Sequence, residues 1–154
     1  MRFIFIIFYC FIAYSGSAQQ NSFTNLIEKN GKIGIGTKNP DALLTVKGII
    51  HAQEIQVDLK GAIAPDYVFE EYFLGTSTSN PNYQRLSLKE LEVFLYNNHH
   101  LPGISPANKL EDEGMDIVKQ NLLLLEKIEE LTLYIIEQQK DLDLLKQKVE
   151  ILEN

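Results

Sequence analysis

The strongest constraint on the fold is an uninterrupted heptad pattern from Ile117 to Leu152, with no proline or glycine inside it. Nine of the eleven a and d positions are apolar. Such a pattern predicts one long helix whose apolar stripe forms the seam of a coiled coil. The two polar seam positions can fix the register at a cost in stability. The seam consists of Ile117, Asn121, Leu124, Ile128, Leu131, Ile135, Gln138, Leu142, Leu145, Val149 and Leu152.

The last heptads also carry flanking charges that predict how the chains align. In a parallel, in-register arrangement Asp141 faces Lys146 of a sister chain, and Lys148 faces Glu153. Opposite charges at these positions favour that orientation. Isoleucine at a with leucine at d favours two strands over three. The heptads alone therefore favour a parallel homodimer.

The first heptads are apolar beyond the seam, which predicts a second contact face. This wider set contains Leu122, Leu123, Leu125, Leu133 and Ile136. We expect that end of the helix to pack on the preceding part of the chain, and the later heptads to project as a stalk. A single helix lying across its own domain is the alternative.

The N-terminus has the three parts of a secretory signal. Arg2 gives a positive charge, an apolar run follows from residue 3 to 14, and small residues lead to Ala18. The run of about twelve residues is shorter than the roughly 20 that span a bilayer. We expect cleavage before Gln19, no membrane span afterwards, and export to the periplasm, the cell surface or the medium. Removal of Cys10 then leaves no cysteine for a disulfide, a thiolate nucleophile or zinc.

Between these ends, the chain predicts an α+β fold with short, glycine-punctuated strands. Apolar and polar or glycine residues alternate through residues 33–36, 44–50 and 55–59. The spacing of Gly31, Gly34 and Gly36 is the reverse of a dinucleotide fingerprint, and no helix start follows it, so tight strand packing is the favoured interpretation. The expected segments are a signal peptide at 1–18, a flexible linker at 19–30, a β stalk region at 31–61, a small mixed α/β segment at 62–116 and a coiled coil at 117–154.

The mixed segment contains a clear helix start. Ser87 precedes a helical pattern from Leu88, and Glu90 completes a capping box. The helix is expected to end at residues 97–98, and residues 101–106 are expected to form a turn. Residues 66–69 follow a proline and are expected to be extended, and residues 76–81 are expected to form a surface loop.

The charge distribution excludes nucleic acid as a partner. The formal net charge is -7. Residues 111–154 contribute 12 acidic and 5 basic side chains, whereas residues 19–110 contribute 9 and 8. A zipper that binds DNA needs a basic helix before its heptads, but here the preceding residues are acidic and interrupted by Gly114. The acidity therefore belongs to the solvated side of the helix.

No catalytic or metal-binding constellation is evident. His99 and His100 are adjacent and lack the i, i+4 spacing that directs two imidazoles at one ion, so we interpret them as cations at a helix C-terminus. Glu70, Glu71 and Asp66 lack a second catalytic feature and are interpreted as solvated charges. We expect no enzymatic activity, no cofactor and no bound metal.

Three stretches resemble the C-terminal module of secreted tail-fibre-like surface proteins of Bacteroidetes. They are residues 65–69 (PDYVF), 100–104 (HLPGI) and 124–134 (LLEKIEELTLY), and residues 34–48 resemble a glycine-rich stalk repeat of phage tail fibres. The resemblance implies a homotrimer, and more distantly a tail-spike intramolecular chaperone module that cuts itself. The Ser-Asp of such self-cleaving modules is missing, and Ser87 and Lys89 would not face each other on a helix.

These observations predict an exported structural or assembly module that associates with itself. A larger fibre or surface protein is a further candidate partner. An adhesin-type binding module is the first alternative, suggested by the loop at 76–82 and the aromatic residues at 67–73. An autoproteolytic intramolecular chaperone is the second.

Overall fold

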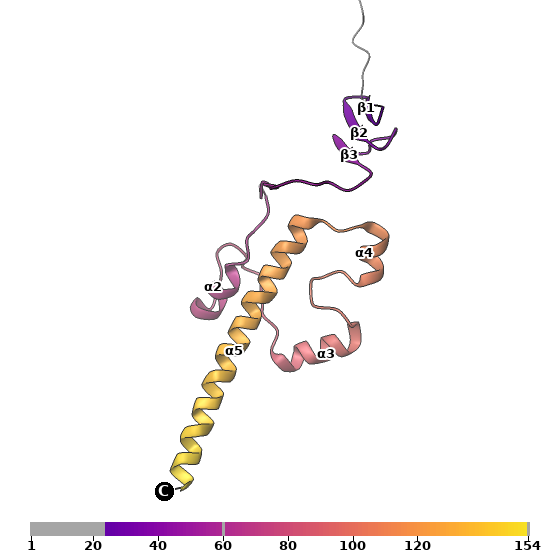
Figure 1. Cartoon of the computed structure of the whole chain (residues 1–154). Coiled ribbons are helices and arrows are strands. Elements are labelled where there is room, and N and C mark those ends of the chain that lie inside the picture. The colour runs from indigo at the N-terminus through magenta and orange to yellow at the C-terminus, as the bar shows by residue number, and fades with distance from the viewer. Residues whose placement is uncertain (1–23, 60, 154) are drawn as a thin grey trace, which may run out of the picture. The chain divides into compact units, whose positions relative to one another are not determined.

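The computed structural model describes residues 24–59 and 61–153. The expected signal peptide and the first residues of the expected linker lie outside this range. The fold is mixed α and β, as predicted, with three strands followed by helices (Figure 1). Internal contacts divide the chain into one unit up to Ile55 and another from Gln56 onward.

The first unit contains a three-stranded sheet. Strand β1 (Leu26–Lys29) pairs antiparallel with β2 (Lys32–Ile35), which pairs in parallel with β3 (Leu44–Val46). Asn30 and Gly31 join β1 to β2 with φ of 54° and 75°, the type I′ geometry of a two-residue hairpin. The prediction that residues 19–30 form only a loose linker was therefore wrong from Leu26 onward, and the Asn-Gly dipeptide was the signal for it.

Two glycines of this unit permit close approach of the backbone. A Cβ on Gly34 would lie 2.5 Å from the Thr37 carbonyl oxygen, and a Cβ on Gly36 would lie 2.7 Å from that of Lys47. Gly36 also has a φ of 73°, which disfavours a side chain. The interpretation of these glycines as packing residues is confirmed.

The strands expected after Val46 do not form. The described residues between 47 and 59 include no strand, and the apolar side chains there, Ile49, Ile55 and Val57 among them, are exposed. An extended segment becomes a strand only when a neighbour accepts its hydrogen bonds. Among the described residues β3 pairs only with β2, so alternation alone overestimated the sheet.

The second unit contains α2 (Tyr67–Leu74), α3 (Leu88–Asn98), α4 (Ala107–Glu113) and α5 (Ile117–Glu153). The expected long helix and the capped helix are both confirmed. Ser87 accepts a hydrogen bond from the Glu90 amide, and the Glu90 side chain accepts one from the Ser87 amide. This capping box explains the start of α3.

Two of these helices differ from the sequence expectation. Helix α2 replaces the extended stretch, because Pro65 restricts the residue before it and not those after it. Asp66 occupies its N-cap, and Gly75 ends it in the left-handed conformation at a φ of 77°. Helix α4 was not predicted. It follows Pro106 and ends at Gly114, inside a segment interpreted only as a turn and an acidic run.

The hydrophobic core is small and lies where α2 packs along α5 (Figure 1). Tyr67 and Val68 of α2 are buried against Leu133 of α5. Phe69, Tyr72 and Tyr83 pack around this cluster. Within the described residues, no helix combines the length and the apolar run that a membrane crossing requires.

Candidate functional site

The seam of α5 is exposed over its whole length. Its nine apolar side chains retain between 48% and 85% of their accessible surface. Asn121 and Gln138 are exposed as well. Contiguous apolar surface of this extent is typical of sites of association.

A different face of α5 contacts the rest of the second unit. Its buried members are Lys127, Glu129, Glu130, Leu133 and Tyr134, none of which occupies an a or d position. We call these five residues and Glu126 the inward face. The expectation that part of the second apolar set packs on the preceding chain is confirmed for Leu133, which is fully buried, whereas Leu125 and Ile136 remain exposed.

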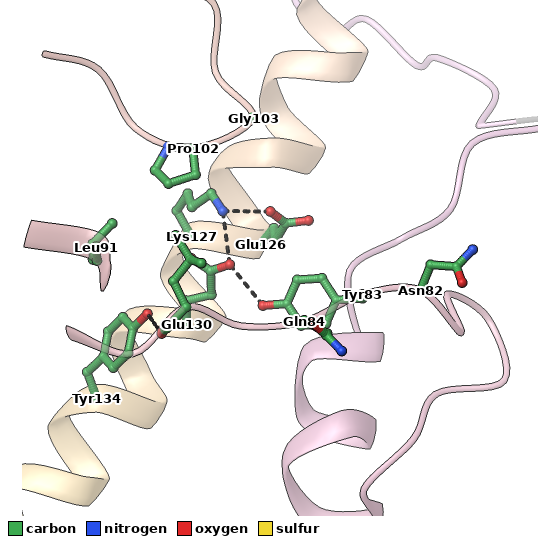
Figure 2. A pocket seen from close by; sticks show the side chains of 11 residues that line it. Asn82, Tyr83, Gln84, Leu91, Pro102, Gly103, Glu126, Lys127, Glu130 and Tyr134 are labelled. Atoms are coloured by element: carbon green, nitrogen blue, oxygen red, sulfur yellow. Dashed lines mark hydrogen bonds and ion pairs between the residues drawn. The ribbon is translucent and has the colours of Figure 1, made fainter. Parts of the chain in front are cut away.

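A lysine lies at the centre of the inward face (Figure 2). The Lys127 ammonium is 2.7 Å from a carboxylate oxygen of Glu126 and 2.9 Å from one of Glu130. Tyr83 donates a hydrogen bond of 2.8 Å to the same Glu130 oxygen, and Tyr67 donates one to Glu126. Two elements distant in sequence are thereby attached to one turn of α5.

The electrostatics of this cluster favour the protonated forms of its lysine and its two tyrosines. Burial acts to lower the pKa of Lys127, but its hydrogen bonds with Glu126 and Glu130 outweigh burial and raise the pKa. Burial, and then the hydrogen bond to a carboxylate, raise the pKa values of Tyr67 and Tyr83. A lysine that is held protonated and a tyrosine that is held neutral provide no base or nucleophile near neutral pH. The cluster forms a joint between the segments that contain Tyr67 and Tyr83 and helix α5.

A second joint lies one to two turns further along α5. The Arg85 guanidinium carbon is 4.5 Å from the Tyr134 ring centroid and 5.5 Å from that of Tyr72. The Arg85 side chain forms an ion pair of 2.5 Å with Glu137. The Tyr134 hydroxyl donates to the Leu86 carbonyl at 2.5 Å. Cation–π contact and a bound carboxylate together hold the residues before α3 against α5.

Glu129 differs from its neighbours because it has no bonding partner for one carboxylate oxygen. The side chain is 5% exposed, and Oε2 is buried without a hydrogen bond. Burial, followed by the nearby carboxylates of Asp66 and Glu126, raises its pKa to about 7. This group is consequently partly protonated near neutral pH.

A hollow of about 350 Å³ adjoins the lysine cluster (Figure 2). It is lined by the segment from Asn82 to Leu86, by Leu91, by Pro102 and Gly103, and by α5 from Glu126 to Tyr134. The charged groups at its base already bond one another. The hollow thus presents no unpaired cation or anion to a small molecule.

The other sequence candidates are dispersed. His99 ends α3 in the left-handed conformation, and His100 stacks edge-on against Phe94 at 5.6 Å. Glu70 accepts a hydrogen bond of 2.6 Å from Ser77. Across residues 24–59 and 61–153, no cluster of three or more histidine, cysteine or acidic side chains could hold a metal ion.

The loop that suggested a binding tip is exposed, as predicted, except for Ser77 and the half-buried Asn80. Ser77 is buried and accepts a hydrogen bond from the Asn80 amide. Tyr67 belongs to the core, and only Phe73 and Leu74 at the end of α2 are widely exposed. The Ser87 hydroxyl donates a hydrogen bond to the Glu90 carboxylate within the capping box. Ser87, which was considered together with Lys89 for self-cleavage, is therefore bonded to Glu90.

Sequence reasoning missed the inward face. Glu126, Lys127, Glu129 and Glu130 were assigned to the solvated side of the helix, because a heptad pattern identifies a and d positions and says little about the others. Tyr83 and Arg85 gave no signal within a polar loop. Searches of protein-family models, curated proteins and solved structures found no match to this chain.

Proposed function

We propose that this chain is an exported, non-enzymatic structural module of a tail-fibre-like surface protein, and that it assembles with copies of itself through α5. The exposed seam is the observation that carries this proposal. It presents nine apolar side chains at heptad spacing along one helix, and the inward face is already in use. A second α5 can therefore cover the seam without displacing any part of the fold.

The partner that fits this seam best is another copy in parallel register. The pairs Asp141 with Lys146 and Lys148 with Glu153 join chains in that orientation, and all four side chains are exposed. In the middle heptads the g positions hold Lys127 and Tyr134, which are buried in the chain's own contacts. The charges that set orientation are thus confined to the last two heptads. We favour a homotrimer on the resemblance, with a dimer as the alternative on the seam composition.

The test is the mass of the chain that starts at Gln19. Light scattering across micromolar concentrations is expected to give two or three times the monomer mass, which also decides between dimer and trimer. A monodisperse monomer would refute the proposal.

Two neighbouring leucines provide a matched pair of variants. Leu145 is a seam residue and 56% exposed, whereas Leu144 is outside the seam and 49% exposed. Leu145→Lys places like charges against one another between chains and is expected to reduce the assembly to monomers. Leu144→Lys adds the same charge on the outer side and is expected to leave the mass unchanged. Equal effects of the two variants would contradict a seam.

The export part of the proposal has a separate test. Expression of the whole chain in a bacterial host, followed by intact-mass measurement of the exported fraction, is expected to show one species beginning at Gln19. A product that retains residues 1–18 would contradict the signal peptide. Two fragments cut within residues 19–154 would instead support the chaperone alternative.

A further inference from the structure

The three strands of the first unit place their apolar side chains on one side. In the register of the sheet, Leu26, Ile35 and Val46 lie side by side across the strands. Ile33 and Leu44 lie side by side in a second row, together with Glu28. Directly paired residues point to the same face of a sheet. We call these six residues the apolar sheet face.

The opposite face is covered by the chain itself. The missing side chain of Gly34 points at the Thr37 carbonyl oxygen, 2.5 Å away. Thr45, its neighbour on β3, accepts hydrogen bonds of 3.1 Å from the amides of Asp41 and Ala42. Thr45 in turn donates to the Asp41 carboxylate at 2.7 Å. The connection between β2 and β3 therefore covers the less apolar side of the sheet.

Within residues 24–55, no described segment covers the apolar sheet face in this way. Leu26, Ile33, Ile35 and Leu44 are exposed, and Val46 is half-buried. Within residues 24–55 no apolar side chain is buried, so the described part of this unit has no core of its own. A sheet must bury its apolar side against another layer, and residues 24–55 do not supply one.

We propose that the apolar sheet face packs against the same face of the other copies of this chain in the assembly, as a second assembly surface. This inference rests on the proposed function, because α5 brings the copies together. The face is compatible with itself, since its one charged group, Glu28, accepts a hydrogen bond of 2.9 Å from the Gly31 amide and lies beside the hairpin turn. No pair of like charges has to meet at its centre.

The size of the face explains why the same chain also needs α5. Five apolar side chains bury much less than the roughly 800 Å² per partner of a stable interface. Parallel association of α5 links the first units through the segment that precedes α2, and such tethering raises their local concentration to roughly the millimolar range. The sheet contact is thus expected to form within the assembly and not between separate chains.

Cysteine cross-linking tests this arrangement, because the chain from Gln19 contains no cysteine. Ile35→Cys reports on the apolar sheet face, and Lys38→Cys, exposed on the covering loop, is its control. Leu152→Cys reports on parallel association of α5. After mild oxidation, Ile35→Cys and Leu152→Cys are expected to give a covalent dimer on a denaturing gel, and Lys38→Cys is expected to remain monomeric.

The outcomes separate this inference from the proposed function. If the Leu152→Cys variant cross-links and the Ile35→Cys variant does not, the sheet contact is overturned and the coiled coil is retained. Absence of both, together with a monomer by light scattering, would overturn both proposals. If Ile35→Cys resists a maleimide reagent but does not cross-link, another segment or another protein covers the face, and a second copy does not.

The dependence on α5 gives a further measurement. Adding Leu145→Lys to Ile35→Cys is expected to reduce the cross-linked fraction at least tenfold, because the tether is lost. Adding Leu144→Lys is expected to leave that fraction unchanged. Cross-linking that survives Leu145→Lys at micromolar concentration would overturn the dependence on tethering.

Discussion

The inward face and the seam of α5 lie on one helix and invert the usual distribution of side chains. The inward face buries Lys127, Glu129 and Glu130, although charged groups are rarely buried unless they are paired. The seam exposes leucine, isoleucine and valine to water. The inward face is stable because most of its charges have partners within the chain, whereas the apolar side chains of the seam remain exposed in the described residues.

Under the proposed assembly, one helix would serve two separate contacts. Specific contacts determine which segments pack on the inward face. They are the hydrogen bonds from Tyr67 and Tyr83 and the cation–π contact of Arg85, and each requires a particular geometry. The seam offers only apolar shape and spacing, which any correctly registered heptad helix can match. The inward face is therefore specific to this chain, and the seam is suited to identical copies.

The largest expected effect comes from removing the central cation of the inward face. Lys127→Met leaves Glu126 and Glu130 as neighbouring buried carboxylates with only tyrosine hydroxyls to bond. Breaking a buried ion pair from one side costs about 3–5 kcal/mol, and we expect a loss of that size in the free energy of unfolding. Denaturant titration at fixed protein concentration measures it.

Lys109→Met, in α4 and outside the proposed assembly surfaces, is the matched control for this experiment. Its ammonium is 3.8 Å from Glu113, and its side chain is 54% exposed. Exposed ion pairs contribute about 0–1 kcal/mol. A comparable loss in the two lysine variants would show that the cluster around Lys127 is no more important than a surface pair.

The next prediction compares two leucines on opposite sides of α5. Leu133 is fully buried, and Leu131 is an exposed seam residue. Leu133→Ala is expected to lower the free energy of unfolding by about 3 kcal/mol at every protein concentration, because it leaves a cavity. Leu131→Ala is expected to act through assembly, so its effect grows as the protein is diluted. The same concentration dependence for both variants would contradict the separation of the two faces.

The smallest effect is expected from Glu129, the unpaired member of the inward face. Its folded pKa of about 7 lies above the ordinary value of 4.5, so the folded chain binds more protons between these values. Stability should therefore fall as pH rises from about 4.5 to 7 and remain low above that. Glu129→Gln is expected to remove this dependence and to stabilise the chain at pH 8 by about 1–3 kcal/mol.

Thermal unfolding of the Glu129→Gln variant and the parent chain at pH 5 and pH 8, at equal protein concentration, measures this effect. Glu150→Gln, in the exposed C-terminal part of α5, controls for the loss of a negative charge on the helix. A parent chain that gains stability between pH 5 and 8 through Glu129 would contradict the assigned direction.

Local signals predicted the elements that depend on neighbouring residues. The capping box of Ser87 and Glu90 placed the start of α3, and the absence of proline and glycine after Ile117 gave the bounds of α5 to within a residue or two. Helix α2 was missed because its length is set by Pro65, Gly75 and burial of Val68 against Leu133, which lies more than 60 residues away. No pattern near Val68 contains that contact.

The sequence by itself determined that the C-terminal quarter is one helix with an apolar seam, because helix formation and heptad spacing are properties of consecutive residues. Only the tertiary structure decided what the rest of the helix circumference does. The sequence pattern predicted solvated charges at Lys127, Glu129 and Glu130. In the structure this side of the helix is buried, because distant segments that contain Tyr67, Tyr83 and Arg85 pack against it. Burial depends on which segments meet in space, and that depends on the free energy of the whole unit and not on the local pattern.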